Sequence, residues 1–184
     1  MAAEDVTVTK PPTIGTALAK KRQSPEAVIE RISEGDDLIA GMGNSEPATV
    51  LDAIEAQAGR LSGVRIHQML PFRERRYMHG HFSGLRHVSW FLSPADREAF
   101  HKGTCDLVPN SFSEVPSLMR RSTRCSLVLA SVSPPDRHGY FSLGTHADYV
   151  AALIGEAPFF VEVNHQILRT YGENQVHLSQ VVGW

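Results

Sequence analysis

Residues 37–47 read DLIAGMGNSEP, an apolar run that leads through a glycine turn to a proline. The run over residues 37–42 has the length and apolar content of a parallel strand that is buried on both faces. Residues 43–46 are turn formers, and Pro47 suits the first position of a helix. The stretch therefore predicts a buried strand, a tight turn and a helix, in that order.

The same alternation continues on both sides of this stretch. Apolar residues from Val50 to Ala58 recur at helical spacing and extend the helix that begins at Pro47. Further helices are predicted over residues 24–33, 93–102, 113–119 and 145–154, and further strands over residues 64–70, 86–92, 106–109, 126–132, 159–163 and 176–182. Strands that alternate with helices form right-handed βαβ units. The sequence thus predicts an α/β fold with a mostly parallel sheet and helices on both faces.

The composition excludes several classes of protein. The chain has 184 residues, of which 42% are hydrophobic, and this suits one compact domain with its own core. Lysine and arginine (18) nearly balance aspartate and glutamate (20), so neither nucleic acid nor an anionic membrane is an expected partner. Cys105 and Cys125 form neither a CxxC pair nor a disulfide framework.

Residues 1–13 form a polar stretch ahead of the predicted domain, residues 14–184. Acidic residues stand where a signal peptide would be basic, and no apolar segment follows them. No segment approaches the ~20 apolar residues of a membrane span. We therefore expect a cytoplasmic protein.

Ligands of such sheets bind at the carboxyl ends of the strands, so the loops after Met42, Leu70, Val132 and Val163 should share one rim. The backbone N–H groups of the glycine turn, residues 43–45, suit a carboxylate or a developing oxyanion at this rim. A plain strand-to-helix connection capped by its serine explains the turn equally well, because the turn lacks the dinucleotide and P-loop patterns.

The most informative stretch is SPPDRHGYFSLG, residues 133–144, directly after the strongest predicted strand. Its prolines and glycines fix the backbone path, and a long rigid loop at a strand's carboxyl end is typical of a functional site. In a purely structural interpretation, Asp136 closes a turn, and Tyr140 and Phe141 pack beneath it. Asn164 ends another predicted strand and reaches the same rim.

Six motifs in this order and spacing resemble the N-terminal domain of the acetyl-CoA hydrolase/transferase family, which includes 4-hydroxybutyrate CoA-transferases. They are GMGNSEP (41–47), DLVP (106–109), SEVP (113–116), SPPDRHGYFSLG (133–144), EVN (162–164) and RTYG (169–172). The resemblance runs from about residue 24 to residue 182, and SPPDRHGYFSLG is its most specific part. One departure is HQIL (165–168), where family members often carry a proline-containing stretch, so the acid specificity stays open.

This resemblance implies a CoA-transferase-like domain in a protein of roughly twice this length, with the active site between two α/β halves. In the family reaction, a glutamate attacks the acyl-CoA thioester and carries CoA as a glutamyl thioester before an acid or water accepts it. The resemblance places that glutamate in the C-terminal half, so no catalytic residue is expected here, and Glu46 is not the expected nucleophile. The residues implied to line the acid and acyl pocket of this half are Gly43, Asn44, Ser45, Ser133, Pro134, Asp136, Gly139, Tyr140, Ser142, Gly144 and Asn164.

Coenzyme A and acyl-CoA are then substrates rather than permanently bound cofactors, and no metal site is expected. The expected partners are a small carboxylic acid, an acyl-CoA, the C-terminal half on the same or a separate chain, and further copies in a homo-oligomer. Acyl-CoA hydrolysis is an alternative that differs in whether water resolves the intermediate. A non-catalytic acid-binding or assembly module also stays open. A sugar-phosphate isomerase or regulator of similar fold would need a phosphate cradle that the sequence does not show.

Three further groups have simpler interpretations. The run Arg73-Glu74-Arg75-Arg76 could contact CoA phosphates, but so short a charge run is typical of a solvated loop. His79 and His81 have no cysteine or carboxylate set at metal spacing. Met69, Leu70 and Phe72 are expected to pack in the core or to line the acyl pocket.

Overall fold

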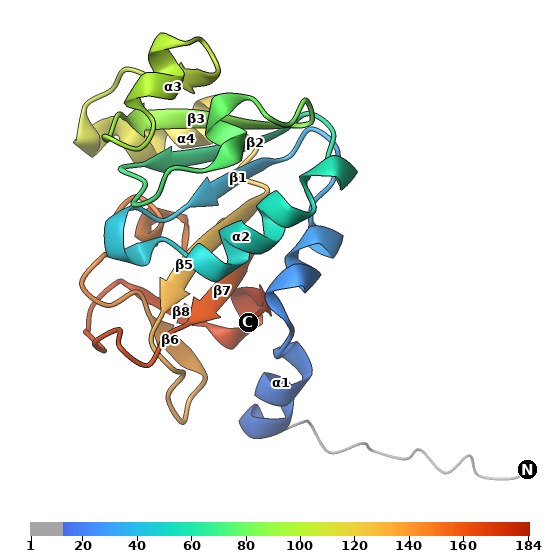
Figure 1. The fold of residues 1–184 in the computed structure, drawn as a ribbon. Coiled ribbons are helices and arrows are strands. Elements are labelled where there is room, and N and C mark those ends of the chain that lie inside the picture. Colours follow the sequence, from blue (N-terminus) through green and yellow to red (C-terminus); the bar gives the residue numbers. More distant parts are fainter. Residues whose placement is uncertain (1–12) are drawn as a thin grey trace, which may run out of the picture.

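The computed structural model describes residues 13–184, which form a large and a small sheet (Figure 1). The polar stretch predicted over residues 1–13 lies outside the described residues, apart from Thr13. The large sheet has seven strands in the order β4-β3-β2-β1-β5-β7-β9, and every neighbouring pair is parallel. These strands are β1 (Asp37–Ala40), β2 (Val64–Met69), β3 (Leu85–Phe91), β4 (Cys105–Leu107), β5 (Leu127–Val132), β7 (Phe159–Val163) and β9 (Val181–Gly183).

Helices cover both faces of this sheet, which confirms the predicted fold class (Figure 1). The α-helices are α1 (Ile14–Lys21), α2 (Ala48–Ala56), α3 (Arg97–His101) and α4 (Val115–Ser122). The short 3-10 helices are η1 (Pro25–Arg31), η2 (Gly43–Ser45), η3 (Ala58–Arg60), η4 (Arg76–His79), η5 (Phe112–Glu114), η6 (Ala151–Leu153) and η7 (Leu178–Gln180). No helix among the described residues is long and apolar enough to cross a membrane.

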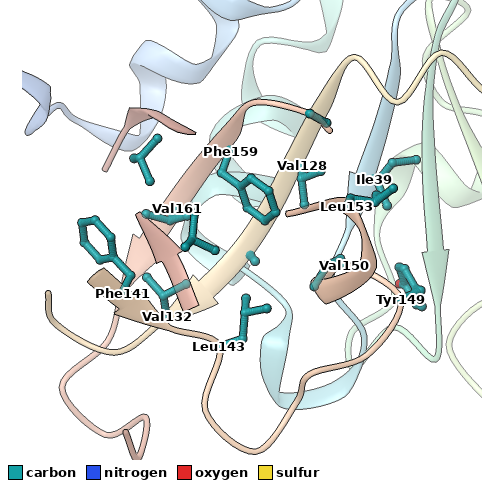
Figure 2. Close-up of a cluster of buried hydrophobic side chains, with 14 of the residues drawn as sticks. Ile39, Val128, Val132, Phe141, Leu143, Tyr149, Val150, Leu153, Phe159 and Val161 are labelled. Carbon is teal, nitrogen blue, oxygen red and sulfur yellow. The ribbon is translucent and has the colours of Figure 1, made fainter. Parts of the chain in front are cut away.

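Alternation along the strands divides the core into two clusters. In β5, Leu127 and Leu129 face the cluster that includes α2, whereas Val128 and Val132 face the cluster that includes α4 and η6. Successive side chains of a strand point to opposite faces, so a strand buried on both sides is apolar throughout. Figure 2 shows the second cluster, in which side chains of β5 and β7 pack with those of the segment around η6.

The predicted helix over residues 145–154 is wrong, because that segment consists of turns and the short helix η6. Asp148 supplies the physical reason. Its carboxylate accepts hydrogen bonds from Val150 N (2.8 Å) and Met42 N (3.2 Å). A side chain that bonds the backbone two residues ahead competes with helix formation. The bond to Met42 also ties the segment to the turn after β1.

The predicted strand over residues 176–182 divides into β8 (Gln175–His177) and β9, with η7 between them. The ring of His177 accepts a hydrogen bond from Ser179 N (3.2 Å) and so caps η7. β8 pairs antiparallel with β6 (Tyr140–Ser142) to form the small sheet. β6 lies within the stretch predicted as a loop, so that loop is in fact part of a sheet.

Two N-terminal elements also differ from the prediction. Residues 24–33 contain the 3-10 helix η1 rather than an α-helix. Helix α1 was not predicted from the sequence. It has no buried residue, so it lacks the strong apolar periodicity that marks a core helix.

Candidate functional site

A pocket of ≈ 440 Å³ lies at the carboxyl ends of the central strands. Of the four loops predicted to share this rim, those after Met42, Leu70 and Val163 contribute to it, whereas the stretch after Val132 contributes only Leu143. Five segments form its wall: the turn after β1, the loop after β2, the end of β5, the segment after β6, and the end of β7 with its following loop. The lining residues are Gly43, Asn44, Glu46, Ala48, Phe72, Ser131, Leu143, Thr145, His146, Glu162, Asn164, Gln166, Ile167 and Leu168.

The glycine turn offers one free backbone donor rather than three. Gly43, at φ +52°, donates its N–H to Leu70 O (3.4 Å), and Ser45 N donates to Met42 O (2.9 Å). Asn44 N has no acceptor among the described residues, since it lies in the first turn of η2, where a helix provides none. Ser45 does not cap α2, and its buried hydroxyl has no partner within the described chain. The donor that can meet a ligand is therefore Asn44 N–H.

Glu46 lies in the pocket with both carboxylate oxygens engaged. Oε1 accepts a hydrogen bond from Arg75 Nη2 (3.1 Å). Oε2 accepts from Phe72 N (2.8 Å) and from Gln68 Nε2 (3.1 Å). The backbone carbonyl of Glu46 accepts from Ser131 Oγ (3.1 Å) at the end of β5. This residue thus joins the loops after β1 and β2 to β5.

Arg75 corrects the prediction that residues 73–76 form a solvated loop. Its side chain is only 4% exposed, whereas Arg73 and its other neighbours in the run are exposed. It pairs with Glu46 and with Asp52, and it also donates to Ala48 O (3.3 Å). Burial of a guanidinium requires such partners, because an unpaired buried charge is costly.

Glu162, near the carboxyl end of β7, caps helix α2. Its Oε2 accepts hydrogen bonds from Thr49 N (2.8 Å) and Val50 N (3.2 Å), and Oε1 accepts from Thr49 Oγ1 (3.2 Å). The residue that precedes α2, Pro47, makes no side-chain cap of its own. A carboxylate at a helix N-terminus satisfies free N–H groups and faces the positive end of the helix dipole. The second carboxylate of the pocket wall is therefore also engaged.

His146 reaches the pocket beside the glycine turn. Its Nδ1 lies 3.1 Å from Thr145 Oγ1. Its Cδ2 and Nε2 would each lie 3.8 Å from a Cβ placed on Gly43. Nε2 has no hydrogen-bond partner among the described residues, so this edge of the ring is free to meet a ligand.

Asp136 closes a turn within residues 133–144. Its carboxylate accepts a hydrogen bond from Tyr140 N (2.9 Å) and forms an ion pair with Arg169 (2.9 Å). Arg169 also donates to Pro134 O (3.4 Å) and Tyr140 O (3.0 Å). These contacts hold the backbone of the stretch in place. They match the alternative in which Asp136 has a structural role and closes a turn.

The remaining predicted residues of this stretch support the small sheet. Ser133 Oγ accepts from Ser142 N (3.1 Å), and Ser142 Oγ accepts from Gly144 N (3.1 Å). Gly139 and Gly144 adopt positive φ angles of +85° and +70°, which glycine adopts without strain. Leu143 is the residue of the stretch that lines the pocket. Of the predicted site residues, the structure thus brings Gly43, Asn44 and Asn164 together in the pocket wall.

Asp148, which accepts a hydrogen bond from the backbone just before the glycine turn, has a raised pKa. Burial raises the pKa of its carboxyl to about 7, although the N–H groups of Val150 and Met42 act in the opposite direction. Within residues 13–184, no basic side chain offsets this burial. The carboxyl that supports the backbone at Met42 therefore keeps its proton to a higher pH than an exposed aspartate does.

One cluster of metal-ligand types occurs within the described residues, away from the pocket. His87, Asp96 and Cys105 are buried, with ligand atoms within 4.8 Å of one another. Hydrogen bonds already occupy Asp96, which accepts from Ser93 N (2.6 Å) and lies 3.2 Å from His87 Nε2. Burial raises the pKa of the Cys105 thiol to about 12, which disfavours the thiolate that zinc binds.

Sequence reasoning missed the roles of Arg75, Asp148 and His146. Glu162 did leave a signal, since a glutamate inside an apolar strand calls for a partner. Arg75 could not be distinguished from its charged neighbours, and His146 fell within a segment predicted as helix. The positions of these three missed residues depend on which loops the strand order of the sheet brings together. The local sequence pattern does not predict that order.

The comparisons with known proteins agree with this fold. Residues 14–182 match the acetyl-CoA hydrolase/transferase N-terminal domain. The chain is 33% identical over 159 residues to a succinyl-CoA:cyclohexane-1-carboxylate CoA transferase of Geobacter metallireducens, with 86% of this chain and 36% of the relative covered. It is 28% identical over 168 residues to a 4-hydroxybutyrate coenzyme A transferase of Clostridium kluyveri, with 88% and 38% covered.

Solved structures give the same result. RipA from Yersinia pestis superposes with a TM-score of 0.81 at 26% identity, and the match covers 92% of this chain and 43% of that one. A 4-hydroxybutyrate CoA-transferase from Porphyromonas gingivalis shares the fold, with a TM-score of 0.62, 24% identity, and 90% and 38% of the two chains covered. The chain thus spans less than half the length of each of these four relatives. On these matches, the chain belongs to the acetyl-CoA hydrolase/transferase family and corresponds to the N-terminal domain of that family.

Proposed function

We propose that this chain is the N-terminal half of an acyl-CoA:carboxylate CoA-transferase that works through a glutamyl-CoA thioester. This half supplies the pocket for the acid and the acyl group, and it is inactive without the C-terminal half. Coenzyme A and acyl-CoA act as substrates, not as bound cofactors. The relatives from Geobacter metallireducens and Clostridium kluyveri are named as CoA transferases, which favours transfer to an acid over hydrolysis.

The observation that carries this proposal is that both carboxylates of the pocket are engaged. Glu46 pairs with buried Arg75, and Glu162 caps α2. A nucleophilic carboxylate must instead be free to attack the thioester carbon. The covalent step therefore requires a carboxylate from outside these residues, which agrees with the greater length of the relatives.

The rest of the wall suits a small acid with a short carbon chain. Asn44, Asn164 and Gln166, which carry side-chain amides, line the pocket together with the apolar residues Phe72 and Ile167. A pocket with a few convergent polar groups among apolar side chains is typical of small-molecule sites. The polar groups meet the carboxylate, and the apolar surface meets the carbon chain.

Thioester exchange tests the proposal. The chain is incubated with succinyl-CoA and a panel of short carboxylates, alone and fused to the C-terminal part of the Geobacter metallireducens relative. Exchange of CoA and a borohydride-trapped glutamyl adduct are expected only for the fused protein. An adduct on the chain alone would overturn the proposal and make Glu46 the first candidate nucleophile. A folded fusion without exchange would contradict the half-enzyme role.

A further inference from the structure

His146 is the only side chain of the pocket wall, among the described residues, that can become a cation. The other ionisable lining residues are Glu46 and Glu162, both acidic. Arg75 and Arg169 lie nearby in the fold, but neither lines the pocket, and each is ion-paired with a carboxylate. Any positive charge that this wall presents to a ligand therefore comes from His146.

Two free donors lie beside the same turn. His146 lines the pocket, with Nδ1 at 3.1 Å from Thr145 Oγ1. Its Nε2, a donor when the ring is protonated, lies 3.8 Å from where a Cβ on Gly43 would stand. Asn44 N, the next amide of the turn, is the other donor without an acceptor in the described chain. A carboxylate has two oxygens and can accept from both donors at once.

The charges around the turn explain why a cation is needed here. Glu46 is neutralised by Arg75, and the charge of Glu162 is offset by the N-terminus of α2. These contacts engage the positive partners near the turn, so that within the described residues none of them is left for an incoming anion. A ligand carboxylate therefore gains a favourable charge interaction here only from a further donor with positive charge. His146 Nε2–H, when the ring is protonated, provides such a charge-assisted hydrogen bond.

We propose that His146 binds the carboxylate of the acid in this pocket through Nε2–H, with Asn44 N–H as the second donor, and so determines which small molecules this half accepts. The inference rests on the proposed acid-binding role of the pocket. It names the residue that distinguishes a carboxylate from an uncharged isostere. The substrate class that it selects is short carboxylic acids whose carboxylate group binds at the glycine turn.

Titration of the 184-residue chain with butyrate and with butyramide tests this directly. The two probes have the same shape and differ in charge, and sodium chloride keeps the ionic strength constant. In wild type, butyrate should give saturable shifts of the Asn44 amide and the His146 ring protons in NMR spectra, whereas butyramide should not. His146→Gln should weaken butyrate binding about tenfold, as expected for one lost charge-assisted hydrogen bond.

Two further variants make the result specific. His146→Lys restores a cation at this position and should recover most of the lost affinity. His165→Gln removes an exposed histidine from the neighbouring loop, outside the pocket wall, and should bind butyrate like wild type. Because His146 is only partly buried, the variants should keep the wild-type spectrum away from the pocket.

The outcomes separate this inference from the proposed function. If His146→Gln binds butyrate with unchanged affinity while the Asn44 amide still responds, the role of His146 is overturned and the acid pocket stands. If butyrate moves neither residue in wild type, His146 does not bind the acid in this half. The exchange assay with the fused protein then decides on its own whether the half-enzyme role holds.

Discussion

Glu46 Oε1 lies 3.1 Å from Arg75 Nη2, and the two side chains are only 2% and 4% exposed. The pair joins the turn after β1 to the loop after β2, next to the pocket. An isolated buried charge is far more costly than an exposed one, because the protein interior solvates it poorly. The position of the pocket wall therefore depends on this ion pair.

Replacement of Arg75 by methionine should destabilise the fold strongly. Methionine fills part of the volume but leaves the Glu46 carboxylate buried without its cation, and the expected loss is about 3–5 kcal/mol. Urea unfolding followed by circular dichroism measures it. The matched control is Arg60→Met, which breaks an ion pair with Glu30 whose side chains are 56% and 68% exposed. That control should cost about 1 kcal/mol or less, and equal losses in the two variants would contradict a structural role for the buried pair.

The cap that Glu162 places on α2 gives a second prediction. Glu162→Gln keeps the shape of the side chain but removes its charge and one acceptor, so unfolding should become easier by about 1 kcal/mol. Hydrogen exchange of the Thr49 and Val50 amides should become faster in the variant. Glu156→Gln, which removes an exposed partner of Arg120, serves as the control. Unchanged exchange at Thr49 and Val50 would show that the cap has no energetic role.

Local patterns predicted the elements that depend on local chemistry. The run over residues 37–47 became β1, the turn and α2 because its apolar strand, glycines and proline act within a few residues. The helix predicted over residues 145–154 is wrong because the carboxylate of Asp148 binds the amide of Val150 and also that of Met42, over a hundred residues away in sequence. The periodicity was that of a helix, but the tertiary hydrogen bond prevailed.

The candidate site was predictable only in part, for the same reason. The rim could be inferred from the parallel topology, and with it Gly43, Asn44 and Asn164. Which charged residues are buried there follows from pairs such as Glu46 with Arg75, whose members are far apart in the chain. No local pattern indicates such a pair before the strand order is known.

Gly41 is expected to tolerate no side chain. A Cβ at this position would lie 2.5 Å from Ser45 Oγ and 2.7 Å from Ser45 O, inside normal contact distance. Gly41→Ala should therefore destabilise the protein by about 1–3 kcal/mol, because the turn after β1 must shift. Gly59→Ala is the matched control, since a Cβ there meets nothing within 4 Å. Its effect on thermal unfolding should be neutral or stabilising by up to about 1 kcal/mol. The same loss at both sites would exclude the contact with Ser45 as the cause.

The pH dependence of stability should change in the variant Asp148→Asn. Burial raises the pKa of Asp148 to about 7 from its ordinary value of 3.8, so the folded state retains a proton that the unfolded chain loses as pH rises through this range. The contribution of Asp148 to the free energy of unfolding therefore falls as pH rises from about 4 to 7. His67 acts oppositely, because burial lowers its pKa to about 4 from 6.5, and its effect on stability rises with pH between these values.

In wild type the two effects oppose each other, and Asp148→Asn removes only the first. The free energy of unfolding of the variant, relative to wild type, should therefore increase between pH 5 and pH 8 by up to about 3 kcal/mol. Urea unfolding across this range measures the difference. Asp36→Asn is the control, because Asp36 also accepts a backbone hydrogen bond, from Ser33 N, but in an exposed turn. If the difference between Asp148→Asn and wild type is constant from pH 5 to pH 8, the folded and unfolded chains bind the same number of protons at Asp148 over this range, and the raised pKa is contradicted.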